Sequence, residues 1–265
     1  MGHMVNGNIG LMYCRQQSQS GEWELISVTQ YLTESCAISN KTKEIAYVSP
    51  FLLEGVNHNV KARLFPDLVN YEYLHFSNSD RLLMFYSYAT LHSRQYRQRY
   101  AEFLKGDFPR IPLTKDVVLF RRLADLGGEL IDFHLLKSPD SSFSAVSYPV
   151  AGTDRVDNGF PMYVAPGEKD LISRPFHTPA PRGRVYINRH EGNNDNAQYF
   201  EGITPEAWNF HIGGYQVLEK WLKDRRGRTL SADDREHYRK VVKAIVETIR
   251  VMKEIDEAIP GWPLP

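Results

Sequence analysis

The sequence has few of the features that mark disulfide-rich, zinc-binding or membrane proteins. Only two of its 265 residues are cysteines, Cys14 and Cys36, which are too few for a disulfide framework or a four-cysteine zinc site. No apolar run approaches the roughly 20 residues that a membrane-spanning helix needs. We therefore expect a protein of the reducing cytoplasm.

Short motifs that carry catalytic chemistry are also absent. The chain lacks the phosphate-binding GxxxxGK[ST] loop, the dinucleotide GxGxxG turn, the zinc-binding HExxH and CxxC spacings and the nucleophilic Gly-x-Ser-x-Gly elbow. Its nine histidines are scattered, and His134, on the apolar face of an expected helix, is interpreted as a core residue. We expect a binding module with no catalytic residue, cofactor or metal site of its own.

The chain carries no net charge, because 32 Lys and Arg balance 32 Asp and Glu. This balance argues against a uniformly basic nucleic-acid-binding protein. Positive charge is nevertheless concentrated in two stretches, with nine cations against three acids in 81–122 and nine against four in 220–243. A neutral protein that binds a polyanion must gather its cations in this way, although a solvated basic face gives the same pattern.

The spacing of apolar residues predicts an α+β fold, with a β-rich N-terminal part followed by a mainly helical C-terminal part with a few short strands. Strands are expected at 8–15, 23–29 and 44–53, where β-branched and aromatic residues alternate with turn formers. Residues 138–183 hold seven of the fifteen prolines, and further strands are expected at 184–189 and 198–200.

Helical periodicity begins at residue 79 and predicts one helix to Leu91 and a second from Ser93 to about Lys105. A third helix is expected to be capped by Thr114 and weakened in its middle by Gly127-Gly128. The expected segments are an expression scar at 1–4, a β-rich recognition subdomain at 5–78, a helical segment at 79–137, proline-rich loops with short strands at 138–200 and a helical segment at 201–265.

The last third of the chain gives the clearest helical signal. One helix after Gly213-Gly214 is expected to turn Tyr215, Leu218, Trp221 and Leu222 inward. Ser231 and Asp234 form a capping box, in which the side chain of each residue accepts a hydrogen bond from the backbone N–H of the other. The apolar positions that follow recur every three or four residues and predict a helix of about seven turns.

Two sets of polar residues are candidates for DNA contact. The connection between the second and third strands could enter the major groove and contact base edges, and its alternative is an ordinary hydrophilic loop. The basic clusters could contact the phosphate backbone. A favourable interaction with the dipole at a helix C-terminus would explain only one or two of the four cations at the end of the helix before Gly227. The candidate base contacts are Ser39, Asn40, Lys41, Thr42 and Lys43, and the candidate backbone contacts are Arg94, Arg97, Lys223, Arg225, Arg226 and Arg228.

Three long stretches resemble the C-terminal target-recognition, or specificity, domain of type ISP restriction–modification enzymes. They are CAISNKTKEIAYVSPFLL (36–53), LHSRQYRQRYAEFLKGDFPRIPLTKD (91–116) and YFEGITPEAWNFHIGGYQVLEKWLKDRRGR (199–228), and VVKAIVETIRVMKEID (241–256) extends the likeness. Residues 57–78 and 150–183 resemble the family less. The likeness implies a fragment of a longer chain that combines nuclease, translocase, adenine methyltransferase and specificity parts.

The resemblance implies that this domain reads a short asymmetric sequence in double-stranded DNA and presents it to the methyltransferase of the same polypeptide. S-adenosylmethionine, ATP and Mg²⁺ are then expected only in the parent, an N6-adenine DNA methyltransferase and restriction enzyme that acts in phage defence. A second hypothesis is a helical docking domain that braces a catalytic neighbour without reading DNA sequence. A stand-alone hydrolase would need a catalytic constellation that the sequence does not contain.

Overall fold

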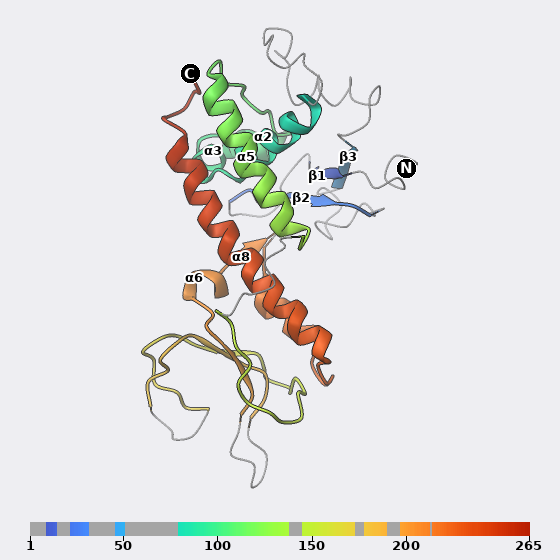
Figure 1. The fold of residues 1–265 in the computed structure, drawn as a ribbon, viewed down its shortest axis with the longest axis vertical. Helices are drawn as coiled ribbons and strands as arrows, with labels where there is room; N and C mark the ends of the chain where they lie inside the picture. Colours follow the sequence, from blue (N-terminus) through green and yellow to red (C-terminus); the bar gives the residue numbers. More distant parts are fainter. Residues whose placement is uncertain are drawn as a thin grey trace. The chain divides into compact units, whose positions relative to one another are not determined.

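The computed structural model describes residues 9–14, 22–31, 46–50, 79–137, 145–172, 178–189, 197–212 and 214–265. Helices and short antiparallel strands form an α+β fold, which confirms the predicted class (Figure 1). The chain divides into unit 1, residues 1–137 and 250–265, and unit 2, residues 138–249. The last helix, α8 (Ala232–Ala258), contributes residues to both units.

The three strands predicted near the N-terminus form one antiparallel sheet of unit 1. The order is β2-β1-β3, with β1 (Gly10–Cys14) between β2 (Ile26–Thr29) and β3 (Ala46–Pro50). Every residue of β1 is buried, as expected for the central strand of a sheet that packs on a core.

Four helices complete most of unit 1: α2 (Ser79–His92), α3 (Arg94–Arg99), α4 (Ala101–Gly106) and α5 (Val117–His134). Ser93 caps α3 by accepting from the Tyr96 N–H at 3.1 Å. The single helix predicted from Ser93 is in fact two, because Tyr100 leaves helical backbone angles. The Tyr100 ring packs edge-on against Trp262 near the C-terminus, with ring centroids 5.9 Å apart.

The cap of α5 differs from the predicted Thr114. Asp116 is the cap, since its carboxylate accepts from the backbone N–H groups of Val118 at 2.8 Å and Leu119 at 3.2 Å. The Thr114 hydroxyl instead donates to the Pro265 carbonyl at 2.8 Å and accepts from the Asp116 N–H. A carboxylate is the better cap because its negative charge also interacts favourably with the helix dipole.

The glycine pair in α5 has a packing function that its helix propensity does not reveal. A Cβ atom on Gly127 would lie 1.8 Å from the Phe85 carbonyl oxygen of α2, and one on Gly128 would lie 3.0 Å from the Phe85 ring. Gly127 therefore allows the backbones of α2 and α5 to cross in close contact. The expected weak point of α5 is the point where the two helices meet.

The core of unit 1 contains a cluster of aromatic and histidine side chains between α2 and α5. The Tyr88 hydroxyl and His134 Nδ1 are 2.6 Å apart, and the rings of His92 and His134 lie 5.4 Å apart. Desolvation and the nearby positive charge of Arg97 lower the pKa of His134 to about 4 and hold the pKa of His92 well below its usual value. His134 is thus a partly buried residue that is hydrogen-bonded to the buried Tyr88, as expected for a histidine with a structural role.

Unit 2 contains a second antiparallel sheet, ordered β4-β5-β6, built from β4 (Met162–Val164), β5 (Arg184–Tyr186) and β6 (Tyr199–Glu201). The short helices α6 (Pro205–Trp208) and α7 (Val217–Lys223) flank a hairpin of β7 (His211–Ile212) and β8 (Tyr215–Gln216). Tyr215, expected to face inward, belongs to this hairpin and is 45% exposed. The other three residues expected to face inward do so: Leu218 and Leu222 are in the core of unit 2, and the partly buried Trp221 packs against it.

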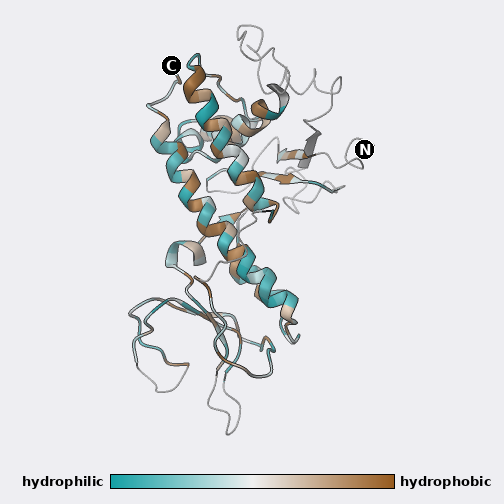
Figure 2. Ribbon diagram, in the orientation of Figure 1, coloured by the Kyte–Doolittle hydropathy of each residue, from teal (hydrophilic) through white to brown (hydrophobic). Residues whose placement is uncertain are grey.

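The long C-terminal helix follows the sequence pattern closely. The Asp234 N–H donates to the Ser231 hydroxyl at 3.0 Å and the Asp234 carboxylate accepts from the Ser231 N–H at 3.0 Å, which confirms the capping box. These hydrogen bonds hold the pKa of Asp234 below its ordinary value. Hydrophobic and hydrophilic residues alternate along α8 (Figure 2), with Tyr238 and Val242 in the core of unit 2 and Ile255 in that of unit 1.

Candidate nucleic-acid interface

The four predicted cations after Lys220 lie at the end of α7 and in the turn that follows it. Lys223 pairs with Glu219 one turn earlier, at 2.8 Å. The Arg225 guanidinium stacks on the Trp221 ring at 3.5 Å, donates to the Trp221 carbonyl and lies 3.5 Å from the Asp234 carboxylate. Both side chains are therefore engaged in contacts within unit 2, and Arg225 fixes the turn to α7.

Arg226 and Arg228 have different surroundings. The Arg226 Nε donates to the Phe160 carbonyl at 2.5 Å, which joins the turn to the loop before β4, yet the residue is exposed. Arg228 is also exposed, and its side chain forms no ion pair with any acid in the described part of the chain. Of the four cations, these two remain the better candidates for contact with a polyanion.

The two predicted cations of α3 separate clearly in the structure. Arg94 is exposed, whereas Arg97 is only 4% exposed and its Nε donates to the Leu91 carbonyl at 2.7 Å. A guanidinium enclosed in this way cannot reach a phosphate without unfolding its surroundings. The expected backbone contact by Arg97 is therefore corrected to a structural role, in which it fixes the turn between α2 and α3.

The predicted base contacts Ser39, Asn40, Lys41, Thr42 and Lys43 lie outside the described residues.

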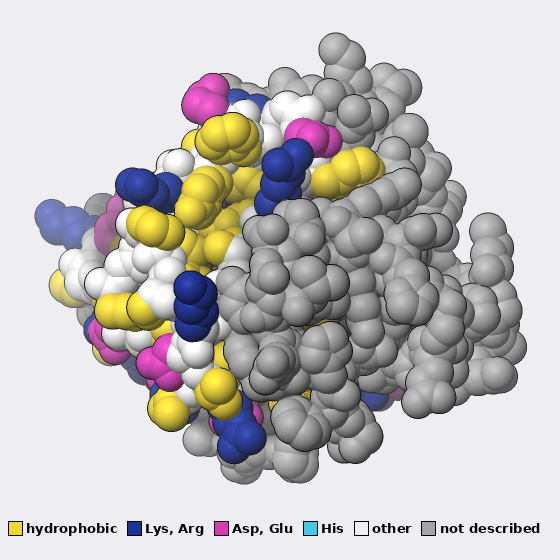
Figure 3. Space-filling model, turned by 90° about the horizontal axis from the view of Figure 1, so that it is seen from above, with side chains coloured by type: hydrophobic (Ala, Val, Ile, Leu, Met, Phe, Trp, Pro, Cys, Tyr) yellow, Lys and Arg dark blue, Asp and Glu magenta, His cyan; other side chains and the backbone are white. Residues whose placement is uncertain are grey.

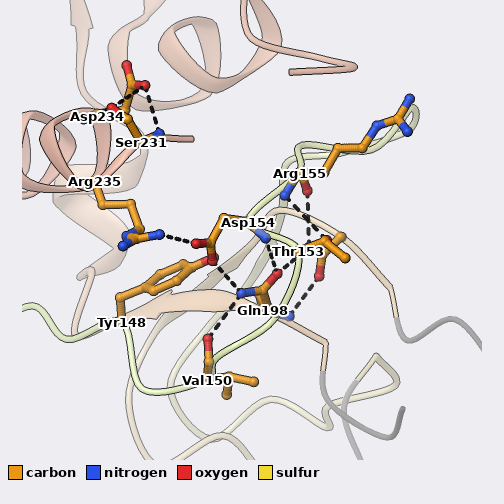
Figure 4. A network of polar contacts seen from close by, with 10 residues as sticks. Tyr148, Val150, Thr153, Asp154, Arg155, Gln198, Ser231, Asp234 and Arg235 are labelled. Carbon is orange, nitrogen blue, oxygen red and sulfur yellow. Dashed lines mark hydrogen bonds and ion pairs between the residues drawn. The ribbon is translucent and has the colours of Figure 1, made fainter. Parts of the chain in front are cut away.

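A polar network in unit 2, which sequence reasoning missed, supports the loop before β4 (Figure 4). Asp154 is its centre: Oδ1 accepts from the Tyr148 hydroxyl at 3.0 Å and from Gln198 Nε2 at 2.6 Å, and Oδ2 accepts from Arg235. The Asp154 N–H in turn donates to Gln198 Oε1 at 2.7 Å. Asp154 has a φ of +55°, which is uncommon for a residue with a side chain and is sustained here by these bonds.

The inner part of this network is almost completely enclosed. Gln198 is 1% and Asn188 is 3% exposed. Asn188 Nδ2 donates to Gln198 Oε1 at 2.9 Å, and the Gln198 backbone N–H donates to Asn188 Oδ1 at 2.8 Å. A buried amide that lost these partners would keep its desolvation cost without compensation. The network therefore specifies one conformation for the loop that carries Arg155, whose side chain extends away from it in Figure 4.

Neither metal-ligand clusters nor membrane-spanning helices occur among the residues that the structure describes. No three His, Cys, Asp or Glu side chains there gather closely enough to hold a metal ion. No described helix combines the length and the low polarity that a bilayer crossing requires.

The sequence matches the family model described as the type ISP C-terminal specificity domain over residues 1–254. A comparison with curated proteins found no match.

Three solved structures are similar in fold. A nuclease-deletion mutant of the type ISP enzyme LlaGI, in complex with a DNA substrate mimic, gives a TM-score of 0.54 at 17% identity over 97% of this chain and 18% of that one. LlaBIII, an ATP-dependent type ISP enzyme bound to DNA, gives 0.54 at 16% identity, over 97% and 16%. The DrdV–DNA complex gives 0.59 at 21% identity, over 93% and 24%. The chain thus spans a quarter or less of each of these proteins.

Proposed function

We propose that this chain, which belongs to the family of type ISP C-terminal specificity domains, recognises a specific sequence in duplex DNA. The observation that carries the proposal is the family match over residues 1–254. Exposed arginines in both units, with Arg94 in unit 1 and Arg226 and Arg228 in unit 2, supply the positive charge that a phosphate backbone attracts.

The parent enzyme is inferred to be an N6-adenine DNA methyltransferase and restriction enzyme that acts in the cytoplasm, in defence against phage. The specificity domain presents its target to the methyltransferase of the same polypeptide. S-adenosylmethionine, ATP and Mg²⁺ are bound by other parts of that polypeptide, and this chain alone neither cleaves nor methylates DNA. Methyl transfer from S-adenosylmethionine to duplex DNA by the purified chain would contradict this division of labour.

Selection from a library of random duplexes tests the recognition function. The chain is expected to enrich one short asymmetric sequence, because base edges in the major groove distinguish all four base pairs. Phosphate contacts alone give affinity without discrimination between sequences. Retention of DNA without enrichment of any sequence would favour the second candidate.

The second candidate is a docking domain that braces a catalytic neighbour, and exposed apolar side chains of unit 1 favour it. Phe103 and Val118 are 75% and 77% exposed. On the face drawn in Figure 3, hydrophobic side chains lie among Lys and Arg side chains rather than apart from them. Such a mixed surface fits a protein partner as well as DNA, so the selection experiment separates the two candidates.

A further inference from the structure

Two exposed arginines of unit 2, far apart in sequence, lie on backbone segments that are hydrogen-bonded to each other. Arg155 lies opposite Thr229 in an antiparallel bridge. The Leu230 N–H donates to the Asp154 carbonyl at 2.8 Å, and the Val156 N–H donates to the Arg228 carbonyl at 2.9 Å. Segment 154–156 and segment 227–230 thus form a short two-stranded pair.

A β-bulge in this pair sets the position of Arg228. Gly227 and Arg228 both face Val156, because the Gly227 N–H donates to the Val156 carbonyl at 2.7 Å. Gly227 has a φ of +77°, the left-handed conformation that glycine adopts at the first position of one type of bulge. Val156 is completely buried, whereas Arg155, Arg228 and Thr229 are exposed.

The other edge of the Arg155 segment is fixed as well. Asn188 Nδ2 donates to the Arg155 carbonyl at 3.0 Å, and the Asp157 N–H donates to the Ile187 carbonyl at 2.9 Å. Together with the Asp154–Gln198 network, these bonds hold the backbone of Arg155 from both sides. The backbone at Arg155 therefore has little conformational freedom left to lose when the side chain binds a ligand.

Neither guanidinium group has an ion-pair partner among the residues that the structure describes. Neither Arg155 nor Arg228 forms an ion pair with an acid of the described segments, whereas their neighbours Arg225 and Arg235 do. Asp157, two residues after Arg155, is partly buried, and the Asp154 carboxylate is occupied by Tyr148, Gln198 and Arg235. The strand pair therefore presents two exposed arginines that no acid of the described residues neutralises.

We infer that Arg155 and Arg228 are two contacts for the DNA sugar–phosphate backbone on this strand pair, with Arg155 held in place by the buried network beneath it. This inference rests on the proposed recognition of duplex DNA. A guanidinium matches the geometry of a phosphate with two parallel hydrogen bonds. The Arg155 segment is hydrogen-bonded on both edges, so these arginines are expected to bind phosphates along a strand and not to enter a groove to contact bases.

Binding of the complete 265-residue chain to a short duplex of mixed sequence, measured between about 50 and 200 mM salt, tests the inference. Arg155→Ala is expected to weaken binding about tenfold, as for loss of one charged hydrogen-bonded contact, and to reduce the salt slope by about one. Arg228→Ala is expected to do the same, and Arg155→Lys to retain the slope with weaker binding. Lys169→Ala, which removes an exposed cation elsewhere in unit 2, is the control and is expected to change neither.

Three results would overturn the inference. Arg155→Ala and Arg228→Ala could bind with the affinity and salt slope of the unsubstituted 265-residue chain, which would leave the proposed function standing. Arg155→Ala could alter only the preference between sequences, which would make Arg155 a base contact. The unsubstituted 265-residue chain could also fail to bind any duplex, and this result would contradict the proposed function as well. Thermal unfolding of each variant shows whether it is folded, and both arginines are exposed, so unfolding is not expected.

Discussion

Gln198 and Asp154, 44 residues apart in the sequence, exchange two hydrogen bonds of 2.6 and 2.7 Å beneath an exposed arginine. In one bond the side-chain Nε2 of Gln198 donates to the Asp154 carboxylate. In the other, the Asp154 backbone N–H donates to the side-chain Oε1 of Gln198. This pair links a loop that faces solvent to the β6 side of the unit 2 sheet. A part-buried polar contact thus supports the loop that carries the exposed Arg155.

Gln198→Ala is expected to lower the free energy of unfolding by about 2 kcal/mol, because Asn188 and Asp154 lose buried partners. Urea denaturation measures the change. Gln98→Ala is the control, since Gln98 is exposed and makes one 3.3 Å bond to Glu22, and it should change the free energy by less than about 0.5 kcal/mol. Equal effects of the two variants would show that the network does not stabilise the loop.

Gly127→Ala is expected to destabilise the chain by about 3 kcal/mol or more, at the upper end for overpacked positions. The added methyl group would meet the Phe85 carbonyl of α2, and backbone cannot move aside as a side chain can. Gly106→Ala is the matched control, because its Cβ would meet no atom within 4 Å. Thermal unfolding of both variants decides the matter, and a stable Gly127→Ala chain would contradict the close crossing of α2 and α5.

Arg97→Ala and Arg94→Ala form a pair that separates structure from binding. Removal of the buried Arg97 side chain is expected to reduce the free energy of unfolding by about 2–4 kcal/mol, through lost packing and an orphaned Leu91 carbonyl. Removal of the exposed Arg94 side chain should leave stability within about 0.5 kcal/mol. Urea denaturation of the two variants gives both values, and an unchanged stability of Arg97→Ala would restore it as a candidate surface contact.

Stability is expected to decrease as the pH falls from about 6.5 toward 4. The unfolded chain protonates His92 and His134 near pH 6.5. The folded chain resists this, because the pKa of His134 is about 4 and that of His92 is also lowered. The unfolded state therefore binds more protons in this range, which lowers the free energy of unfolding.

Urea denaturation of the parent chain and of His134→Gln, at several values between pH 7 and pH 4.5, measures this dependence. The variant lacks one of the two histidines and should lose less stability over the same range. Identical pH profiles for the two proteins would show that His134 does not contribute.

Regular periodicity made part of the fold predictable from sequence. The 27 residues of α8 follow one uninterrupted apolar pattern after the Ser231–Asp234 box, so local signals and tertiary packing agree there. The short α3 and α4 segments were less predictable, because the break at Tyr100 accompanies a contact with Trp262, which is distant in sequence. Gly127 illustrates the same limit, since its value depends on the approach of Phe85 from another helix.

The candidate contacts were predictable only where cations cluster along the sequence. Arg226 and Arg228 stand in such a cluster, whereas Arg155 is an isolated cation in a proline-rich region. Its supporting residue Asp154 depends on partners 44 and 81 residues away, which no local pattern reveals. Composition likewise could not distinguish the enclosed Arg97 from the exposed Arg94, because both lie on the same six-residue helix.

The most direct test of sequence recognition is the ratio of two dissociation constants. The chain is titrated with the duplex obtained from selection and with a scrambled duplex of equal length and composition, at several salt concentrations. Both affinities are expected to fall as salt rises, since each releases counterions, while the selected duplex stays bound at least about tenfold more tightly. A ratio of one at every salt concentration would contradict the proposed function of this domain.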